Sequence, residues 1–240
     1  MTLFLSYLFG AFSKIERPGF LAQVSIFLFS KAFGIDFSNA KKKKFKSLYD
    51  MFTREINRDL GFNKIDFIHP ADGRLVSFGK VKEEQVFLVK GKCYSLNELL
   101  GEEAVNFKDA YFYNYYLSPK DYHRVHHPVS GVYEKCFKIK GALYPVADWF
   151  VKLCPSVFAK NARTVSIVNS PDYGRVASVM VGALNVGSLE MSKGLFRDGS
   201  DEIQVGDHLG TFGLGSSVVV LVNKEFKPEL GKALYGTVIS

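Results

Sequence analysis

Cysteine is scarce in this sequence, and its spacing argues against two kinds of site. The 240 residues contain three cysteines, Cys93, Cys136 and Cys154, and no CxxC pair. An odd number of scattered cysteines argues against a disulfide framework or a zinc site and is compatible with a reducing compartment. We therefore expect ordinary, partly buried thiols.

Long apolar runs are also missing. No continuous apolar stretch near the start approaches the ~20 residues that a membrane-spanning helix needs. Residues 1–12 are apolar, but they lack a basic segment before them and a convincing small-x-small cleavage site after them, so we do not expect a signal peptide. These absences predict a soluble or peripheral protein on the cytoplasmic side.

Several ligand-binding motifs are absent as well. The chain contains neither GxxxxGK[ST] nor GxGxxG, which disfavours nucleotide binding, and it contains no HExxH. No segment of about 20 to 50 residues recurs, so a repeat architecture is not expected.

Positive charge and apolar residues are plentiful. Thirty-one Lys and Arg residues against 24 Asp and Glu give a formal net charge of +7, which favours nucleic acid, acidic lipid or an acidic substrate without choosing among them. A hydrophobic fraction of 47% is enough to fill a large core. The length suggests one substantial domain with an appendage, or two small domains.

Residues 1–58 have the apolar spacing of amphipathic helices. We predict a first helix that ends near Lys14, a second that begins at Pro18 and ends at Gly34, and a third capped by Ser38 or Asn39. The apolar residues of the third helix are Phe45, Leu48, Tyr49 and Phe52.

Five lysines, Lys41 to Lys44 and Lys46, lie at the start of the third predicted helix. Such a run is often only a solvated helix face. Beside two strongly apolar helices it also fits an interfacial anchor, in which each lysine near an anionic surface adds about 1 kcal/mol. The helices can alternatively pack against the rest of the protein, and both interpretations can hold together.

Residues 59–240 have the pattern of short strands separated by Gly, Pro, Asn and Asp. The sequence therefore predicts an α+β fold, with N-terminal amphipathic helices followed by a β-rich catalytic domain. A helical turn is expected at Ser95–Gly101. The expected strands are Gly73–Gly79, Gln85–Val89, Tyr111–Leu117, Gly131–Lys138, Thr164–Val168, Arg175–Val181 and Ser217–Val222.

Three of the five histidines fall within the segment His123-Arg124-Val125-His126-His127. In an extended segment His123 and His127 point one way and His126 the other, so three metal ligands on one face are excluded. We therefore expect no metal. A general base from this cluster is more attractive, because unperturbed imidazole titrates near neutrality.

A glycine-rich loop, Gly210 to Gly215, precedes Ser216 and leads into the expected strand Ser217–Val222. Its simplest interpretation is a loop that enters a buried strand. Together with Asp72, in a Pro-Ala-Asp-Gly turn, and the histidines, however, Ser216 completes an Asp, His and Ser set that can activate a hydroxyl. Gly215 leaves its own carbonyl carbon unshielded, as a serine that attacks the preceding peptide bond requires.

Six segments together resemble motifs of the phosphatidylserine decarboxylase family, in the family's order and over nearly the whole chain. Each motif is weakly specific, but six in order are strong. They are Phe52-Thr53-Arg54-Glu55, Pro70-Ala71-Asp72-Gly73, the stretch Lys90 to Gly101, Tyr122-His123-Arg124-Val125-His126, the stretch Gly141 to Val146, and Leu214-Gly215-Ser216-Ser217.

Two positions depart from the family pattern. Ser217 stands where the family usually has Thr, which keeps a hydroxyl beside the nucleophile. Ala162 replaces the Glu of an Asn-Glu-Arg element, which removes a carboxylate and puts its supporting role in doubt.

The resemblance implies a proenzyme that cuts itself between Gly215 and Ser216. Ser216 is then the nucleophile, His126 its general base and Asp72 the residue that orients His126, with the logic of a catalytic triad. The products are a β chain, residues 1–215, and an α chain, residues 216–240, whose first residue becomes a covalent pyruvoyl group. No PLP or metal is expected.

The resemblance also implies the reaction. The pyruvoyl group forms a Schiff base with the amine of phosphatidylserine and accepts electrons as CO2 leaves, giving phosphatidylethanolamine. His123 is a candidate for substrate-carboxylate contact or reprotonation, although the alternation turns it away from His126. We expect a peripheral protein on the cytoplasmic side of an anionic cell membrane, a homodimer of the αβ unit and no nucleic-acid partner.

Alternative functions remain open at this point. The nearest is a pyruvoyl decarboxylase that acts on another serine phospholipid. A serine hydrolase that uses Asp72, His126 and Ser216 between molecules predicts an intact chain. A membrane-binding module without catalysis predicts that Ser216→Ala leaves function unchanged.

Overall fold

Most of the chain is placed by the structure, a computed structural model. It describes residue 13 and residues 19–81, 86–89, 92–144, 157–183, 189–192, 201–212 and 216–239. The first predicted helix and residues 213–215 lie outside these ranges, apart from Ser13.

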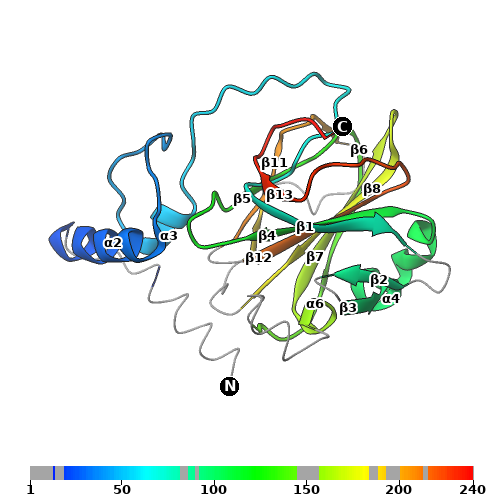
Figure 1. Cartoon of the computed structure of the whole chain (residues 1–240), viewed down its shortest axis with the longest axis horizontal. Helices are drawn as coiled ribbons and strands as arrows, with labels where there is room; N and C mark the ends of the chain where they lie inside the picture. Colours follow the sequence, from blue (N-terminus) through cyan, green and yellow to red (C-terminus); the bar gives the residue numbers. More distant parts are fainter. Residues whose placement is uncertain are drawn as a thin grey trace.

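An antiparallel sheet of eight strands forms the body of the protein, with the order β10-β6-β7-β8-β12-β4-β1-β13 (Figure 1). This sheet and the few short helices confirm the α+β, β-rich prediction. The strands are β1 (Gly73–Lys80), β4 (Tyr111–Leu117), β6 (Gly131–Ile139), β7 (Arg163–Ser170), β8 (Gly174–Val181), β10 (Glu202–Ile203), β12 (Ser216–Val222) and β13 (Gly231–Ala233).

Two further sheets and three short helices accompany the large sheet. A three-stranded sheet has the order β5-β11-β9, and β2 pairs with β3. The elements are β2 (Val86–Val89), β3 (Lys92–Ser95), β5 (Arg124–His126), β9 (Leu189–Met191), β11 (His208–Phe212), α4 (Leu96–Leu100), the 3-10 helix η1 (Gly101–Phe107) and α6 (Val157–Lys160).

The two faces of the large sheet have different neighbours. Arg163 of β7 donates hydrogen bonds to the backbone carbonyls of Glu98 and Leu99, so α4 covers one face. On the other face, Tyr113 and Tyr115 contact Phe67 and His69, which precede β1. The main hydrophobic core includes residues from both faces.

The predicted strands agree closely with the observed ones, because alternating and β-branched residues mark them locally. Tyr111–Leu117 is matched at both ends, and the other predicted strands end within about two residues of the observed ones, as is usual for boundaries. The helical turn expected at Ser95–Gly101 is α4, continued by η1. Cys136 is a free, half-buried thiol, as expected, whereas Cys154 and the side chain of Cys93 lie outside what the structure describes.

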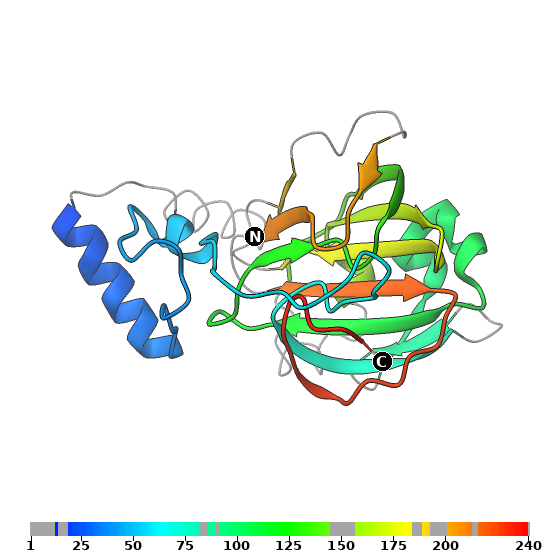
Figure 2. The same cartoon turned by 90° about the horizontal axis from the view of Figure 1, so that it is seen from above.

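The second predicted helix is confirmed as α2 (Gly19–Phe33), after which Gly34 adopts a φ of 64°. Such a positive φ favours glycine and ends a helix. Figure 2 shows α2 beside the sheet rather than on its face. Ala22 and Ile26 are buried, whereas Phe20, Phe27 and Leu28 are more than half exposed.

The predicted start of the third helix is wrong. α3 covers only Leu48–Phe52, and Ser47, not Ser38 or Asn39, is its N-cap. The preceding segment instead pairs with residues 55–57: Lys41 N donates to Glu55 O at 2.9 Å, and Asn57 N donates to Asn39 O at 2.7 Å. These bonds satisfy backbone groups of residues 39–41 without a helix. Repulsion between the neighbouring lysines also disfavours a helix here.

α2 and α3 bury a small hydrophobic cluster of their own, which includes Ile26, Phe45 and Phe52. Among the described helices, none is both long and apolar enough to cross a membrane.

Candidate active site

Ser216 is the first residue of β12 and is fully buried. Its backbone position pairs with Leu117 of β4. Among the described residues, its Oγ has no hydrogen-bond partner. The neighbouring Gly215 lies outside the described residues. The structure therefore describes the predicted cleavage junction only on its serine side.

The side chain of Ser216 faces the side of the sheet against which His69 packs. Directly paired residues of an antiparallel sheet share a face, and alternate residues of a strand return to it. Ser216 therefore shares a face with Val218, and Val218 pairs with Tyr115. The Tyr115 hydroxyl lies 3.1 Å from His69 Nδ1.

Asp72 lies at the same end of the sheet as Ser216. It directly precedes β1, and Gly73 approaches β4 so closely that a Cβ there would collide with the carbonyl of Tyr116. This approach requires glycine, which explains the Asp-Gly sequence. β1 and β12 flank β4, as Figure 2 shows, so their backbones are about 10 Å apart.

The carboxylate of Asp72 binds Arg58 and the backbone of Tyr235. Arg58 donates to its two oxygens at 2.6 and 2.8 Å, and Tyr235 N donates to Oδ1 at 2.8 Å. Arg58 also donates to Tyr235 O at 3.0 Å. The hydrogen bonding to Asp72 is the main reason why the pKa of Arg58 is raised.

His126 lies in β5 with both ring nitrogens engaged. Nδ1 is 2.7 Å from Gly206 O, and a carbonyl only accepts, so Nδ1 carries the hydrogen. Nε2 then accepts from the Tyr122 hydroxyl at 3.1 Å. Burial lowers the pKa of His126 to about 3, so its imidazole is neutral at pH 7 and retains a lone pair on Nε2.

Tyr235 connects Asp72 to His126. Its ring stacks on the imidazole with a centroid distance of 3.7 Å, and its hydroxyl donates to Gly206 O at 3.1 Å, the oxygen that also binds His126. Asp72 and His126 therefore belong to one network, but they share no direct hydrogen bond. The hydroxyl of Ser216 contacts neither of them by a hydrogen bond.

His123 directly precedes β5 and bonds to the end of β11, the strand that comes before the predicted junction. It is fully buried, its Nδ1 is 2.8 Å from Asp121 O, and its ring packs edge-on against Phe52. Burial lowers its pKa to about 4. Its own carbonyl accepts from Phe212 N at 3.0 Å, which fixes the end of β11. The predicted glycine-rich loop is wrong for residues 210–212, because β11 pairs them with β5 and β9.

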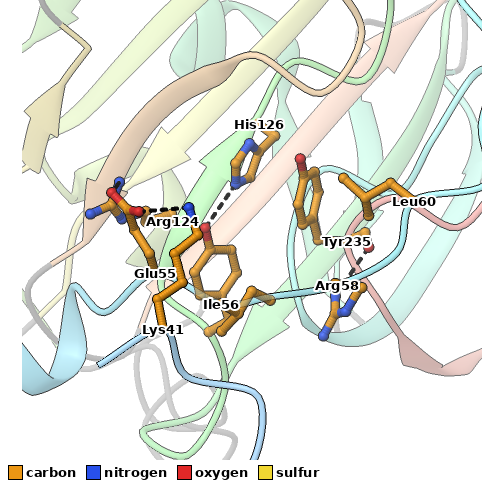
Figure 3. Close-up of a pocket in the computed structure, with 9 residues that line it drawn as sticks. Lys41, Glu55, Ile56, Arg58, Leu60, Arg124, His126 and Tyr235 are labelled. Carbon is orange, nitrogen blue, oxygen red and sulfur yellow. Dashed lines mark hydrogen bonds and ion pairs between the residues drawn. The ribbon is translucent and has the colours of Figure 1, made fainter. Parts of the chain in front are cut away.

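A cavity of about 290 Å3 opens beside His126 (Figure 3). Arg124 and His126 both line it, whereas Val125 between them is fully buried, as strand alternation predicts. The lining residues are Lys41, Glu55, Ile56, Arg58, Leu60, Tyr122, Arg124, His126 and Tyr235.

Sequence reasoning missed Arg58, Gly206 and Tyr235, because no motif marks them. Tyr122 stood within the histidine motif but received no role. The two departures from the family pattern lie in well-supported places: Ser217 is fully buried beside Ser216, and Ala162 exchanges backbone hydrogen bonds with Ala142 and Gly182.

Comparison with known proteins gives one consistent result. The family model for phosphatidylserine decarboxylase matches residues 48–234. A phosphatidylserine decarboxylase proenzyme of Psychromonas ingrahamii is 36% identical over 244 residues, which cover 92% of this chain and 85% of the relative. The proenzymes of Alkalilimnicola ehrlichii, at 32% identity, and Acinetobacter baumannii, at 35%, cover the same share of this chain and 84% and 83% of their own lengths.

Proposed function

The chain belongs to the phosphatidylserine decarboxylase family and is a carboxy-lyase, and from this we propose that it converts phosphatidylserine to phosphatidylethanolamine and CO2. We further propose that it matures by cutting itself at Gly215–Ser216. One observation carries the maturation step: Ser216 places a buried hydroxyl, without a hydrogen-bond partner among the described residues, at the predicted junction.

In the proposed cleavage, Ser216 Oγ attacks the carbonyl carbon of Gly215. A C–O ester bond forms, the peptide C–N bond breaks, and the hydroxyl proton moves through the base to the released nitrogen. Elimination removes the Cα proton of residue 216 and the Gly215 carboxylate, which leaves dehydroalanine. Water then replaces its nitrogen with oxygen and releases ammonia, so that residue 216 becomes a pyruvoyl group.

His126 is the proposed base. Its depressed pKa keeps Nε2 unprotonated at neutral pH, and Nδ1–H is fixed by Gly206 O. Transfer from Ser216 requires that Nε2 exchanges its Tyr122 partner for the serine hydroxyl, directly or through water. Asp72 is proposed to orient His126 by holding Tyr235 against its ring.

The surroundings of residue 216 fit a pyruvoyl group. Its side chain has no hydrogen-bond partner to lose in the part of the chain that the structure describes. Because β12 pairs with β4 on one side and β8 on the other, cleavage leaves the α chain in the sheet. When formed, the pyruvoyl carbonyls supply an acceptor for the electron pair left by CO2. Burial of this end of the sheet excludes water, and His123 is the proposed contact for the substrate carboxylate or for reprotonation.

Ser216→Ala tests the proposal. Ser217→Ala is a matched control, because Ser217 is also buried and its Oγ also has no hydrogen-bond partner among the described residues. Mass spectrometry of the wild type is expected to show residues 1–215 and a fragment from 216 with a blocked terminus. Ser216→Ala is expected to give one uncut chain without decarboxylase activity, and Ser217→Ala to be cut. An active wild-type protein with an intact chain and an unmodified Ser216 would contradict the proposal.

We also propose that residues 1–58 attach the protein to the cytoplasmic surface of an anionic membrane. α2 exposes Phe20, Phe27 and Leu28 on one side, and Lys42 and Lys44 lie exposed in the following segment. An apolar face flanked by lysines suits the boundary between headgroups and acyl chains.

Vesicles that contain phosphatidylserine test this attachment. Phe27→Ser is expected to weaken sedimentation with vesicles several-fold, whereas Ile65→Ser, at an exposed residue outside the helices, is expected to leave it unchanged. High salt is expected to release part of the bound protein. Equal binding by the two variants would refute a role for α2.

Two αβ units are expected to form a dimer, and a native mass of a single 26.9 kDa unit would refute that.

A further inference from the structure

The cavity beside His126 carries more positive than negative charge. Lys41, Arg58 and Arg124 are in its wall, and Glu55 is the carboxylate among them. Asp72 lies behind Arg58 as its ion-pair partner. Because His126 is neutral at pH 7, the described residues around the cavity place three cations against two carboxylates, which leaves one surplus positive charge.

Glu55 holds two of these cations together at one side of the cavity. It pairs with Lys41 at 2.9 Å and with Arg124 at 3.1 Å, and Figure 3 shows the three side chains grouped apart from Arg58. The hydrogen bond from Lys41 is the first cause of the lowered pKa of Glu55. Because Lys41 and Arg124 share the carboxylate of Glu55, each still has N–H groups that can donate to a further anion.

The ammonium group of Lys41 and the guanidinium of Arg124 are held differently. Lys41 is half exposed, so its ammonium remains accessible. Arg124 is fixed by its Nε hydrogen bond to Thr53 O at 2.9 Å and is three-quarters buried. A preorganised guanidinium beside a mobile ammonium is a good arrangement for phosphate oxygens.

The size of the cavity restricts the ligand. At about 290 Å3 it is at the lower limit of small-molecule sites, so it holds one polar headgroup and excludes acyl chains. A single surplus positive charge matches a phosphodiester, which carries one negative charge. Lys41 also belongs to the lysine run, so the cavity adjoins the surface proposed to meet the membrane.

We propose that this cavity binds the phosphodiester of a phospholipid headgroup, with Lys41 and Arg124 as its donors. The assignment rests on the proposed function, because that function brings the protein to a serine phospholipid. It adds a recognition site for the phosphate, separate from the junction at residue 216.

Calorimetry on the Ser216→Ala protein tests the site without cleavage or turnover. The probes are glycerophosphoserine, which has the diester, serine, which lacks it, and inorganic phosphate. We expect saturable binding of glycerophosphoserine, no measurable binding of serine, and weaker binding of inorganic phosphate. Equal affinity for inorganic phosphate and glycerophosphoserine would overturn the diester assignment.

Lys41→Gln and Lys44→Gln form the matched pair, because both remove one exposed lysine charge but Lys44 does not line the cavity. Lys41→Gln is expected to raise the Kd for glycerophosphoserine about threefold to tenfold, as loss of one half-exposed charge does, and Lys44→Gln to change it less than about twofold. Arg124→Gln is expected to raise it further. Equal effects of the two lysine variants would overturn the site.

The binding result and the proposed function fail separately. If wild-type protein does not decarboxylate phosphatidylserine but Lys41→Gln alone weakens diester binding, the proposed reaction is wrong and the site stands. If the wild type is active and Lys41→Gln binds as tightly as Lys44→Gln, the site is wrong and the reaction stands.

Discussion

Ser216 and His126 lie in different surroundings. Ser216 begins β12, which is paired with β4 and β8 and is buried at every residue, whereas His126 lines a cavity open to solvent. The hydroxyl of Ser216 has no hydrogen-bond partner among the residues that the structure describes, but both nitrogens of His126 are engaged. Strand pairing thus positions the first of these groups, and a polar network positions the second.

The difference teaches how each environment is built. β12 is a continuous run of seven residues, so its position follows from pairing with its neighbours. The network around His126 joins Arg58, Asp72, Tyr122 and Tyr235, which come from four separate parts of the chain. Substitutions in the strand are therefore expected to act locally, and those in the network to affect several contacts at once.

Loss of His126 is expected to have the largest effect. His126→Ala removes the proposed base and should slow self-cleavage at least about 100-fold. The time course of the two fragments on a gel measures this rate. His208→Ala is the control. His208 lies opposite His126 in the β5–β11 pair, but its own Nε2 contacts Thr211 Oγ1 at 2.8 Å. Unchanged cleavage in His126→Ala would remove its role as base.

Acid is expected to lower the free energy of unfolding of the protein through its buried histidines. Burial lowers the pKa of His69 and His123 to about 4 and of His126 and His127 to about 3. Below pH 6.5 the unfolded chain therefore binds more protons than the folded one, and the free energy of unfolding falls as the pH falls toward 4. Each histidine contributes up to about 1.4 kcal/mol per pH unit.

Thermal unfolding of uncut Ser216→Ala protein between pH 7 and 4.5 measures this effect at constant ionic strength. The Tm is expected to decrease steadily below pH 6.5. A flat Tm over this range would mean that the histidines are not buried in the neutral form.

Asp72→Asn is expected to have an intermediate effect. It leaves the largely buried guanidinium of Arg58 without its carboxylate, which should lower the free energy of unfolding by about 1–3 kcal/mol and slow cleavage. Urea unfolding and the cleavage time course measure the two effects. Asp109→Asn, at an exposed residue, is the control. If both variants have wild-type stability and cleavage, the Arg58–Asp72 pair does not support the site.

Two substitutions of Tyr235 are expected to have the smallest effects and to separate its ring from its hydroxyl. Tyr235→Phe keeps the ring on His126 and should cleave within about threefold of the wild-type rate, whereas Tyr235→Leu loses the stacking and should be about tenfold slower. The 15N shifts of His126 report whether Nδ1–H is retained. Equal rates and identical shifts in both variants would show that Tyr235 does not position His126.

Local patterns account for most of the strand prediction. The continuous apolar run Val218 to Val222 marks β12, and the alternate tyrosines Tyr111, Tyr113 and Tyr115 mark β4, without reference to the rest of the fold. The third helix was placed too early because its lysine-rich start pairs with Glu55 and Asn57, a non-local contact that no periodicity reveals.

The sequence by itself determined the strand predicted at Ser217–Val222, the glycine that lets Asp72 approach β4, and the family motifs, because turn chemistry and apolar patterning act between near neighbours. Only the tertiary structure decided that Asp72 pairs with Arg58 and reaches His126 through Tyr235. Ion pairs and ring stacking act over a few ångströms in space, so they depend on how distant segments are folded together.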